Sequence, residues 1–215
     1  MDAKRYYEWY NRDDPSSLYR PEDEITFAQR LSWFSKNIPP KSRILDYGCG
    51  EGVLLAELHK NGIAGPESCG VDISENAVGR ASIRFPYLRF LATHPNGITA
   101  FPDGSFDTVI ATEVVEHVFD TDATFSEFHR LLRPGGTLLL SCPYHGFLKD
   151  LVILLTGRMD AHYHDPYSPH IRYYTPATLL SVHRKHGFRL VKQDGVGRFP
   201  CLWNSMVTAA VKQPV

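Results

Sequence analysis

The sequence predicts an α/β fold built on a doubly wound, mostly parallel sheet, and three observations support this prediction. Short apolar runs alternate with segments of helical periodicity across residues 43–142. Glycine, proline and polar residues separate these segments, as in turns between strands and helices. Several apolar runs end at an acidic residue or a threonine. Strands that alternate with helices of this length form parallel βαβ units, which build such a sheet.

The positions of the elements follow from periodicity, caps and turn residues. Apolar residues at helical spacing indicate a first helix over Ile25–Ile38, which Pro39 ends. Ser74 and Thr175 each precede a helical segment and are suitable N-caps. We expect strands at 43–46, 68–73, 87–92, 106–111, 137–142, 188–191 and 205–211, and further helices at 52–61, 74–85, 114–118, 124–132, 147–155 and 176–186.

Composition restricts the class of protein. The chain has 215 residues and a formal net charge of −1, so no global field favours nucleic acid or an anionic membrane. The longest apolar run, Leu151–Leu155, is too short to span a bilayer, and the charged N-terminus is unlike a signal peptide. The cysteines are scattered, which is typical of reduced thiols and not of a disulfide framework or zinc site. We expect a soluble, cytoplasmic protein.

The stretch Ile44–Gly52 carries the strongest functional signal. It reads as a buried strand that stops at Asp46, turns through glycines at alternate positions and opens into a helix. Glycine has no Cβ, so a ligand can lie directly against such a turn. The amide groups at the start of the next helix favour a carboxylate or a phosphate. We expect a small polar ligand of the nucleotide-derivative class at this turn.

Asp72 ends the second strand, about twenty residues after the glycine turn, where a carboxylate binds ribose hydroxyl groups in doubly wound sheets. The alternative is a structural role, because an aspartate can also end a strand or help to cap a helix. The glycine turn upstream favours the ribose role. The G-x-G-x-G spacing of that turn differs from the G-x-G-x-x-G of nicotinamide-dependent enzymes.

Two more segments extend this pattern, so that the chain contains an ordered set of four: Asp46–Gly52, Val71–Ser74, Phe101–Asp107 and Leu131–Gly136. In this order they resemble the class I S-adenosylmethionine-dependent methyltransferases. With Thr112–Val118 added, the chain is similar to small-molecule O-methyltransferases, including those that act on ubiquinone precursors.

This resemblance implies a Rossmann-like, seven-stranded sheet with an antiparallel C-terminal hairpin, in one methyltransferase domain over residues 1–215. It also implies S-adenosylmethionine as the cofactor. In many members an acidic residue after the third strand contacts the adenine, but residues 92–98 contain none, so Thr93 or Asn96 could contact the base instead. The expected cofactor-binding residues are Asp46, Gly48, Cys49, Gly50, Asp72, Ile73, Thr93 and Glu113.

The segment after the fourth strand supplies the candidates for catalysis. Glu113, Glu116 and His117 would share one face of a helix at 114–118 and converge beside the methyl donor. Methyl transfer needs in-line placement, and a hydroxyl acceptor also needs a base, or a metal that lowers its pKa. We expect catalytic roles for His117, His170 and Glu113.

The same segment raises the question of a metal. Related E-x-x-E-H segments bind metal in some ubiquinone-type O-methyltransferases and in a group of RNA 2′-O-methyltransferases. Here Glu113, Glu116, His117 and His170 could hold Mg²⁺ or Mn²⁺. The alternative is that these side chains brace the segment and the cofactor without a metal.

Residues 143–175 are expected to form an insertion on the acceptor side that covers the cofactor as a lid. His145, His162, His164 and His170 could hold a metal or an acceptor there, with Tyr163, Tyr173 and Tyr174 stacking on an aromatic substrate; solvated loop positions are the alternative. The apolar stretch 147–155 has three interpretations: a core helix, a lid over an apolar acceptor, or an interfacial helix, which the few cations disfavour. Residues 1–24 could form a second cover or a surface packing segment.

Three functions are compatible with these residues. The favoured one is methyl transfer from S-adenosylmethionine to a small molecule, on an oxygen nucleophile. The alternatives are a metal-dependent RNA 2′-O-methyltransferase, for which the chain lacks a broad basic stripe, and a non-catalytic Rossmann-type nucleotide binder. The sequence indicates no oligomeric state.

Overall fold

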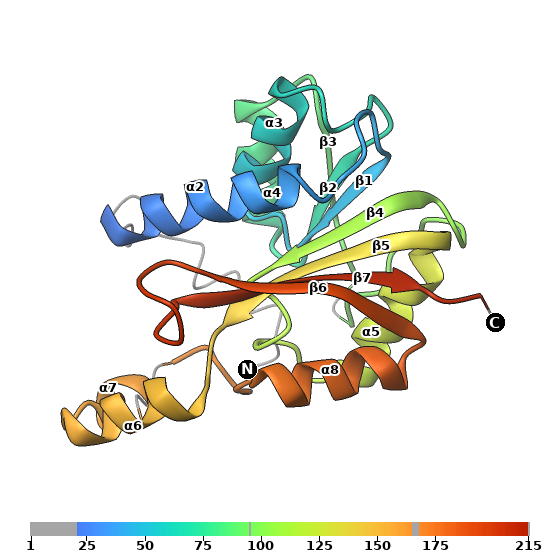
Figure 1. Ribbon diagram of the computed structural model, residues 1–215. Helices are drawn as coiled ribbons and strands as arrows, with labels where there is room; N and C mark the ends of the chain where they lie inside the picture. Colours follow the sequence, from blue (N-terminus) through green and yellow to red (C-terminus); the bar gives the residue numbers. More distant parts are fainter. Residues whose placement is uncertain (1–20, 95, 165–167, 215) are drawn as a thin grey trace.

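The computed structural model describes residues 21–94, 96–164 and 168–214. In these residues a seven-stranded sheet lies between two layers of helices (Figure 1). One layer consists of α2 (Pro21–Ser35), α3 (Val53–Lys60) and α4 (Glu75–Arg84), and the other of α5 (Thr121–Leu131) and α8 (Pro176–Lys185). Two shorter helices, α6 (Phe147–Leu155) and α7 (Met159–Tyr163), lie beyond the sheet, on the side where the parallel strands end.

The strand order is β3-β2-β1-β4-β5-β7-β6. Strands β1 to β5 pair in parallel, whereas β7 runs antiparallel to both of its neighbours, so the predicted fold class is confirmed. The chain direction across the sheet reverses between β1 and β4, and ligand crevices of such sheets lie at this switch point. The strands are β1 (Ile44–Tyr47), β2 (Cys69–Asp72), β3 (Arg89–Ala92), β4 (Phe106–Thr112), β5 (Leu132–Pro143), β6 (Phe188–Val196) and β7 (Ser205–Lys212).

A separate apolar core fills the space on each face of the sheet. Phe34 of α2 and Leu55 of α3 are fully buried against one face, and Phe125 and Phe128 of α5 are fully buried against the other. Strand residues alternate between the two cores, because successive side chains of a strand point to opposite faces. Both sheet faces are therefore covered, as near-continuous apolar strands predict.

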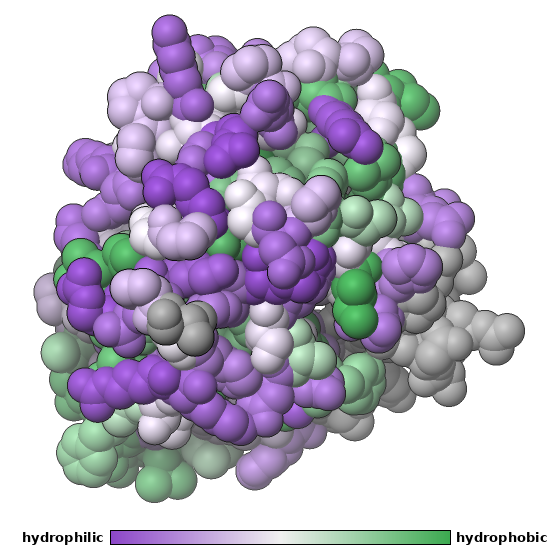
Figure 2. Space-filling model, turned by 90° about the vertical axis from the view of Figure 1, so that its right-hand side faces the viewer, coloured by the Kyte–Doolittle hydropathy of each residue, from purple (hydrophilic) through white to green (hydrophobic). Residues whose placement is uncertain are grey.

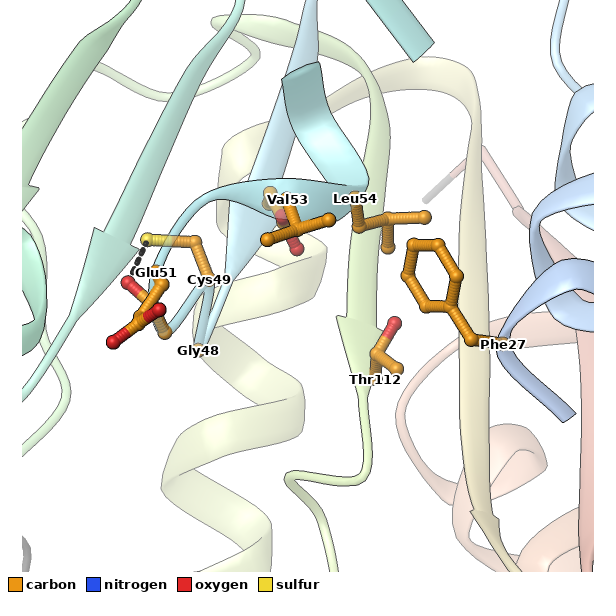
Figure 3. A pocket seen from close by; sticks show the side chains of 9 residues that line it. Phe27, Gly48, Cys49, Glu51, Val53, Leu54 and Thr112 are labelled. Carbon is orange, nitrogen blue, oxygen red and sulfur yellow. Dashed lines mark hydrogen bonds between the residues drawn. The ribbon is translucent and has the colours of Figure 1, made fainter. Parts of the chain in front are cut away.

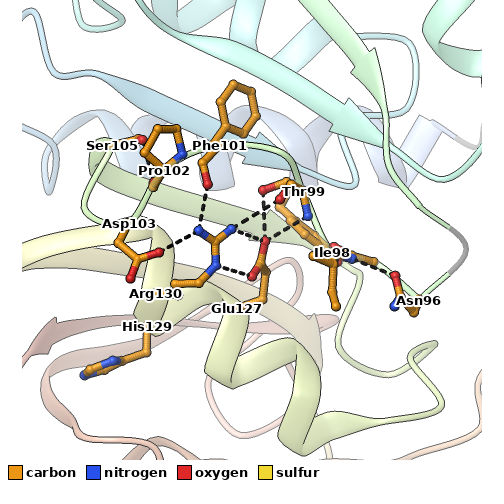
Figure 4. A network of polar contacts seen from close by, with 12 residues as sticks. Asn96, Ile98, Thr99, Phe101, Pro102, Asp103, Ser105, Glu127, His129 and Arg130 are labelled. Carbon is orange, nitrogen blue, oxygen red and sulfur yellow. Dashed lines mark hydrogen bonds and ion pairs between the residues drawn. The ribbon is translucent and has the colours of Figure 1, made fainter.

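A polar network ties α5 to the loop that joins β3 and β4 (Figure 4). The buried carboxylate of Glu127 accepts hydrogen bonds from the backbone N–H and the hydroxyl of Thr99, each at 2.9 Å. Arg130 donates to Glu127 at 2.8 Å and to the Phe101 carbonyl at 2.6 Å. Ionised partners make these bonds stronger than neutral ones, so the loop is held firmly to α5.

Several predicted boundaries are confirmed and others change. Ser74 accepts from Ala77 N and caps α4, and Thr175 forms a capping box at the start of α8. The helix predicted at 114–118 is wrong: residues 115–117 form a turn, and Glu113 before it has a φ of 52°, outside the helical region. The first helix begins four residues before Ile25 and ends before Ile38, and β6 extends beyond the predicted 188–191.

The expected cover at residues 1–24 falls almost entirely outside the described residues. The expected insertion at 143–175 contains α6 and α7. Of the three interpretations of α6, the core helix is wrong, because Ile153 is its only buried residue and Phe147 is 85% exposed. No helix within the described ranges is long and apolar enough to cross a membrane. At the opposite end of the molecule, hydrophilic residues cover most of the surface, and hydrophobic ones gather in smaller groups (Figure 2).

Candidate cofactor and acceptor site

A pocket of about 210 Å³ opens at the switch point, beside the glycine turn (Figure 3). Phe27 of α2 points toward Leu54 of α3 across it, and Thr112 at the end of β4 lies below them. Four of the predicted cofactor residues line this pocket: Asp46, Gly48, Cys49 and Gly50. The pocket is therefore where the sequence places the ligand.

Three glycines of the turn have positive φ angles, and each has a different reason to lack a side chain. A Cβ on Gly48 would collide with Val114, and a Cβ on Gly52 would lie 2.5 Å from the ring of Phe90. A Cβ on Gly50 would meet no atom within 4 Å, although this residue lines the pocket. Gly48 and Gly52 thus permit close packing of the protein, whereas Gly50 leaves open space in front of the turn.

Two carboxylates stand behind the turn. Asp46 is 1% exposed, and its Oδ2 has no hydrogen-bond partner among the described residues. Burial, and then the nearby charge of Asp72, raise the pKa of Asp46 to about 7. Asp72 accepts from the N–H groups of Gly50 and Ser74, each at 2.9 Å, so it fastens the turn to the start of α4.

These features fit the cofactor that the sequence implies. A buried carboxylate oxygen without a partner is costly, and a cationic ligand with N–H donors relieves that cost. S-adenosylmethionine carries an ammonium and a sulfonium group, and the space in front of Gly50 is open. The remaining predicted contacts are placed differently: Asp72, Ile73, Thr93 and Glu113 do not line the pocket, and Asn96 Oδ1 accepts from Ile98 N within its own loop.

Glu113 lies directly after Thr112 and is held by side chains from distant elements. Its Oε1 accepts from Arg30 Nη2 at 3.0 Å and from Ser141 Oγ at 2.8 Å, and its N–H donates to the Ser141 carbonyl. Arg30 belongs to α2, and its side chain is 11% exposed. This ion pair already engages the Glu113 carboxylate, and Glu113 does not belong to the group of three potential ligands described next.

The turn after Glu113 brings three potential ligands together. One side-chain atom each of Glu116, His117 and His170 lie within 4.8 Å of one another. Nδ1 of His117 lies 2.9 Å from the Pro169 carbonyl, which only accepts, so this nitrogen carries the proton and Nε2 has the lone pair. Burial lowers the pKa of His117 and favours the neutral ring.

Glu116 is the most unusual member of this group. It is 1% exposed, and neither carboxylate oxygen makes a hydrogen bond within the described part of the chain. Burial raises its pKa well above the ordinary value. The distance from its Oε1 to His117 Nε2, 3.8 Å, is too long for a hydrogen bond. Of the predicted set Glu113, Glu116, His117 and His170, the last three therefore converge, and a turn brings them together instead of the predicted helix.

Backbone contacts explain why His170 reaches His117 from more than fifty positions away. The Glu116 carbonyl accepts from Ile171 N at 3.0 Å and from Arg172 N at 3.2 Å. The Arg172 side chain donates to the carbonyls of Val118 and Phe119, which fixes the two segments side by side. Three carbonyls in and after the turn, those of Glu116, Val118 and Phe119, thus gain partners from the segment before α8.

The other candidates of the insertion have separate environments. His164 pairs with Asp160 in an exposed contact at 2.9 Å, which matches the solvated alternative. Tyr174 is 6% exposed and belongs to the apolar core with Phe125 and Phe128 of α5, so its ring packs against protein, and its stacking on a substrate stays a prediction. Phe27, Arg30 and Arg172 complete the site and were missed, because nothing in their local sequence signals a contact over so long a separation.

Comparison with known proteins agrees with this geometry. Residues 19–193 match the family described as "Methyltransferase domain". The chain is 28% identical over 197 residues to a ubiquinone biosynthesis O-methyltransferase of Aromatoleum aromaticum, covering 87% of this chain and 81% of that protein. It is 31% identical over 136 residues to the enzyme of the same name from Ralstonia nicotianae, covering 60% and 54%.

Solved structures share the fold. A protein of Pyrococcus horikoshii superposes with a TM-score of 0.73 at 18% identity, covering 95% of this chain and 98% of that one. An S-adenosylmethionine-dependent methyltransferase of Aquifex aeolicus superposes with a TM-score of 0.69 at 17% identity, covering 93% and 99%. With the acidic glycine turn at the switch point and the family match over most of its length, the chain belongs to the methyltransferase domain family and is an S-adenosylmethionine-dependent methyltransferase.

Proposed function

We propose that this enzyme methylates an oxygen atom of a small molecule. The observation that carries the proposal is the position of His117, a half-buried imidazole that burial keeps neutral, just beyond the end of β4, where Thr112 lines the cofactor pocket. A hydroxyl group that accepts a methyl group must lose its proton, and an imidazole is a suitable acceptor for it. The relatives named ubiquinone biosynthesis O-methyltransferase support the same choice of atom.

On the cofactor side, S-adenosylmethionine supplies a methyl group that its sulfonium already activates. Asp46 would accept from the ammonium group through its unpartnered oxygen, and Asp72 would accept from ribose hydroxyl groups while it holds Gly50 and Ser74. Gly50 would leave the space that the ligand occupies. These residues bind and orient, and positioning is a large part of the rate enhancement in such a transfer.

On the acceptor side, Nε2 of His117 would take the proton of the acceptor hydroxyl group. The hydrogen bond from Nδ1 to the Pro169 carbonyl keeps the lone pair on Nε2 and stabilises the ring when it becomes charged. Glu113, which Arg30 and Ser141 hold, would position the segment and not transfer a proton.

We also propose that Glu116, His117 and His170 hold a divalent cation when one is present. The buried carboxylate of Glu116 makes no hydrogen bond in the described part of the chain, and a cation would satisfy it. Two imidazoles and one carboxylate suit Mn²⁺ better than Mg²⁺, which prefers oxygen ligands. A bound cation would lower the pKa of an acceptor hydroxyl group, and His117 would then be a ligand and not a base.

The first experiment measures binding and turnover together. S-adenosylhomocysteine should raise the melting temperature and NAD⁺ should not, and radiolabelled methyl groups should pass to at least one compound of a panel containing phenol, catechol, 3-hydroxybenzoate and 3,4-dihydroxybenzoate. Transfer to RNA but to none of these phenols would favour the RNA 2′-O-methyltransferase instead. Full turnover after dialysis against EDTA would contradict the cation and leave His117 as the base.

Location forms the last part of the proposal. All four cysteines are free, and three of them are buried, as in proteins of a reducing compartment. We therefore propose a cytoplasmic enzyme. Fractionation of cells that express the chain from its own gene checks this directly.

A further inference from the structure

A second imidazole lies on the acceptor side, in a cluster that the chemistry above does not use. His145 follows β5 and is 6% exposed. Its Nδ1 lies 2.9 Å from the hydroxyl oxygen of Tyr163 in α7, and that hydroxyl group donates to Asp150 of α6 at 2.6 Å. The ring of Tyr173, from the segment before α8, packs 5.0 Å from the rings of both His145 and Tyr163.

The donors and acceptors of this cluster fix the tautomer of His145. An ionised carboxylate only accepts, so the single proton of the Tyr163 hydroxyl group points to Asp150. The Tyr163 oxygen must therefore accept from His145, and Nδ1 of His145 carries the ring proton. Nε2 is left with the lone pair, and no other described residue makes a hydrogen bond to it.

The surroundings of Nε2 differ from those of an ordinary core histidine. His183 is also buried, and its Nε2 belongs to the polar atoms that are inaccessible to solvent and unpartnered. Nε2 of His145 is not one of those atoms. Burial lowers the pKa of His145 to about 4, so the ring is neutral at pH 7 and is a weak base. Such a ring accepts a hydrogen bond without removing the proton.

The position of the cluster relates it to the acceptor. β5 pairs with β4, and Glu113 N donates to Ser141 of β5, so His145 leaves the same edge of the sheet as Glu113. Tyr163 and Asp150 line a second pocket of about 530 Å³ between α6 and α7, with Phe147, Leu151, Leu154 and Met159.

We propose that His145 is a substrate-positioning residue, whose Nε2 accepts a hydrogen bond from a hydroxyl group of the methyl acceptor. Tyr163 and Asp150 hold the ring in the tautomer that this contact needs. The inference rests on the proposed small-molecule function and adds the chemistry by which the acceptor is selected: it must present a hydroxyl group to a neutral imidazole.

The test replaces Tyr163 by phenylalanine, which keeps the ring packing and removes the hydroxyl group that fixes the tautomer. At saturating S-adenosylmethionine, and with the phenol of the panel that gives the highest turnover, KM for the phenol should rise about tenfold in the Tyr163→Phe variant, as expected for a lost hydrogen bond. The melting-temperature shift with S-adenosylhomocysteine should stay unchanged. Nitrogen-15 NMR should show the Nδ1–H tautomer of His145 in the wild type and a mixture in the variant.

Two further substitutions separate positioning from support of the fold. His145→Gln offers a carbonyl oxygen near the place of Nε2 and should keep KM closer to the wild-type value than His145→Leu does. Tyr87→Phe is the matched control: Tyr87 packs on His59 with ring centroids 5.6 Å apart and is 61% exposed, and its loss should leave KM unchanged.

The outcomes are distinct. An unchanged KM in Tyr163→Phe, with or without a lower melting temperature, means that the cluster only attaches α6 and α7 to the sheet, and it overturns the inference. A wild-type enzyme that binds S-adenosylhomocysteine but methylates no phenol of the panel overturns it as well, together with the proposed function. Normal wild-type turnover with an unchanged variant overturns the inference alone.

Discussion

The cofactor side and the acceptor side of this site are built by different means. On the cofactor side a short piece of chain, from Asp46 to Asp72, supplies the glycine turn and both carboxylates, and backbone amides make the decisive contacts. On the acceptor side the groups come from the ends of β4 and β5, from α6 and α7, and from the segment before α8. A site formed by the backbone of one short segment can therefore be recognised in a sequence, whereas a site formed by side chains from distant segments cannot.

The two sides also differ in charge. Asp46 is a buried carboxylate, and its Oδ2 has no hydrogen-bond partner in the described residues, so a cationic ligand would stabilise the cofactor side. On the acceptor side, burial lowers the pKa values of the buried His145 and the half-buried His117, so both imidazoles favour the neutral form. A positively charged methyl donor complements the cofactor side, and the neutral hydroxyl acceptor of the proposed function complements the imidazoles.

The largest effect is expected at Asp46. One pKa unit corresponds to about 1.4 kcal/mol, so raising the pKa from 3.8 to about 7 costs the ionised form about 4 kcal/mol in the folded apoprotein. Asp46→Asn removes this cost. The variant should gain about 2 to 4 kcal/mol of unfolding free energy at pH 8 and lose the melting-temperature shift with S-adenosylhomocysteine.

The pH dependence of this stability gain shows whether burial of the Asp46 charge is its cause. The folded pKa of Asp46 lies above the unfolded value, so its contribution is fully present below pH 4 and is lost as pH rises through about 7. The stability gain of Asp46→Asn should therefore shrink toward zero as pH falls from 8 to 4, in urea titrations of both proteins. A gain that does not change with pH would show that burial of the charge is not the reason.

The glycine turn offers the next largest effect and compares two positions directly. Gly48→Ala places a methyl group against Val114, whose branched side chain has little freedom to move, and should cost about 3 kcal/mol of unfolding free energy. Gly50→Ala meets no protein atom and should cost only about 1 kcal/mol through its positive φ. Both substitutions should abolish the melting-temperature shift with S-adenosylhomocysteine. For Gly50→Ala the reason is that the new methyl group enters the pocket. Intact binding in Gly50→Ala would remove this glycine from the cofactor site.

Most of the fold was predictable because local patterns determine it. The apolar strands, the Ser74 cap and the Thr175-Pro176 helix start each follow from contiguous residues, and the structure confirms them. The error at 114–118 has a physical cause. The spacing of Glu113, Glu116 and His117 suggested a helix, but the Glu116 carbonyl accepts from Ile171 N and Arg172 N, and this tertiary pairing favours a turn over a helical hydrogen bond.

The candidate site divides in the same way. Asp46, Gly48, Cys49 and Gly50 line the pocket as the motif predicts. Arg30 could not be predicted as the partner of Glu113, because α2 reaches β4 only through the packing of a whole helical layer. The sequence singled out His170 but treated His145, His162 and His164 alike, and only the three-dimensional structure separates the buried His145 from the exposed His164.

A substitution at Arg172 should weaken the packing of the acceptor side and leave the cofactor side unchanged. Arg172→Met keeps the aliphatic stem and removes the guanidinium that donates to the carbonyls of Val118 and Phe119. We expect a loss of about 1.5 kcal/mol in unfolding free energy and at least a fivefold lower kcat, because His170 moves relative to His117. The shift with S-adenosylhomocysteine should be retained. Equal losses of cofactor binding and turnover would mean that the two sides form one cooperative unit.

The smallest effect is expected at Thr175, five residues after His170. Its hydroxyl group accepts from Thr178 N in the capping box of α8, and Thr175→Ala should cost about 1 kcal/mol, or about 2 to 4 °C in melting temperature for a domain of this size. His170 is attached to the turn through Ile171 and Arg172 and not through the helix cap, so kcat and the phenol KM should both stay at their wild-type values. A fall in kcat as large as that of Arg172→Met would show that α8 positions His170. A loss of stability without a loss of activity would show instead that His170 is positioned by the contact between two loops, the turn after β4 and the segment before α8.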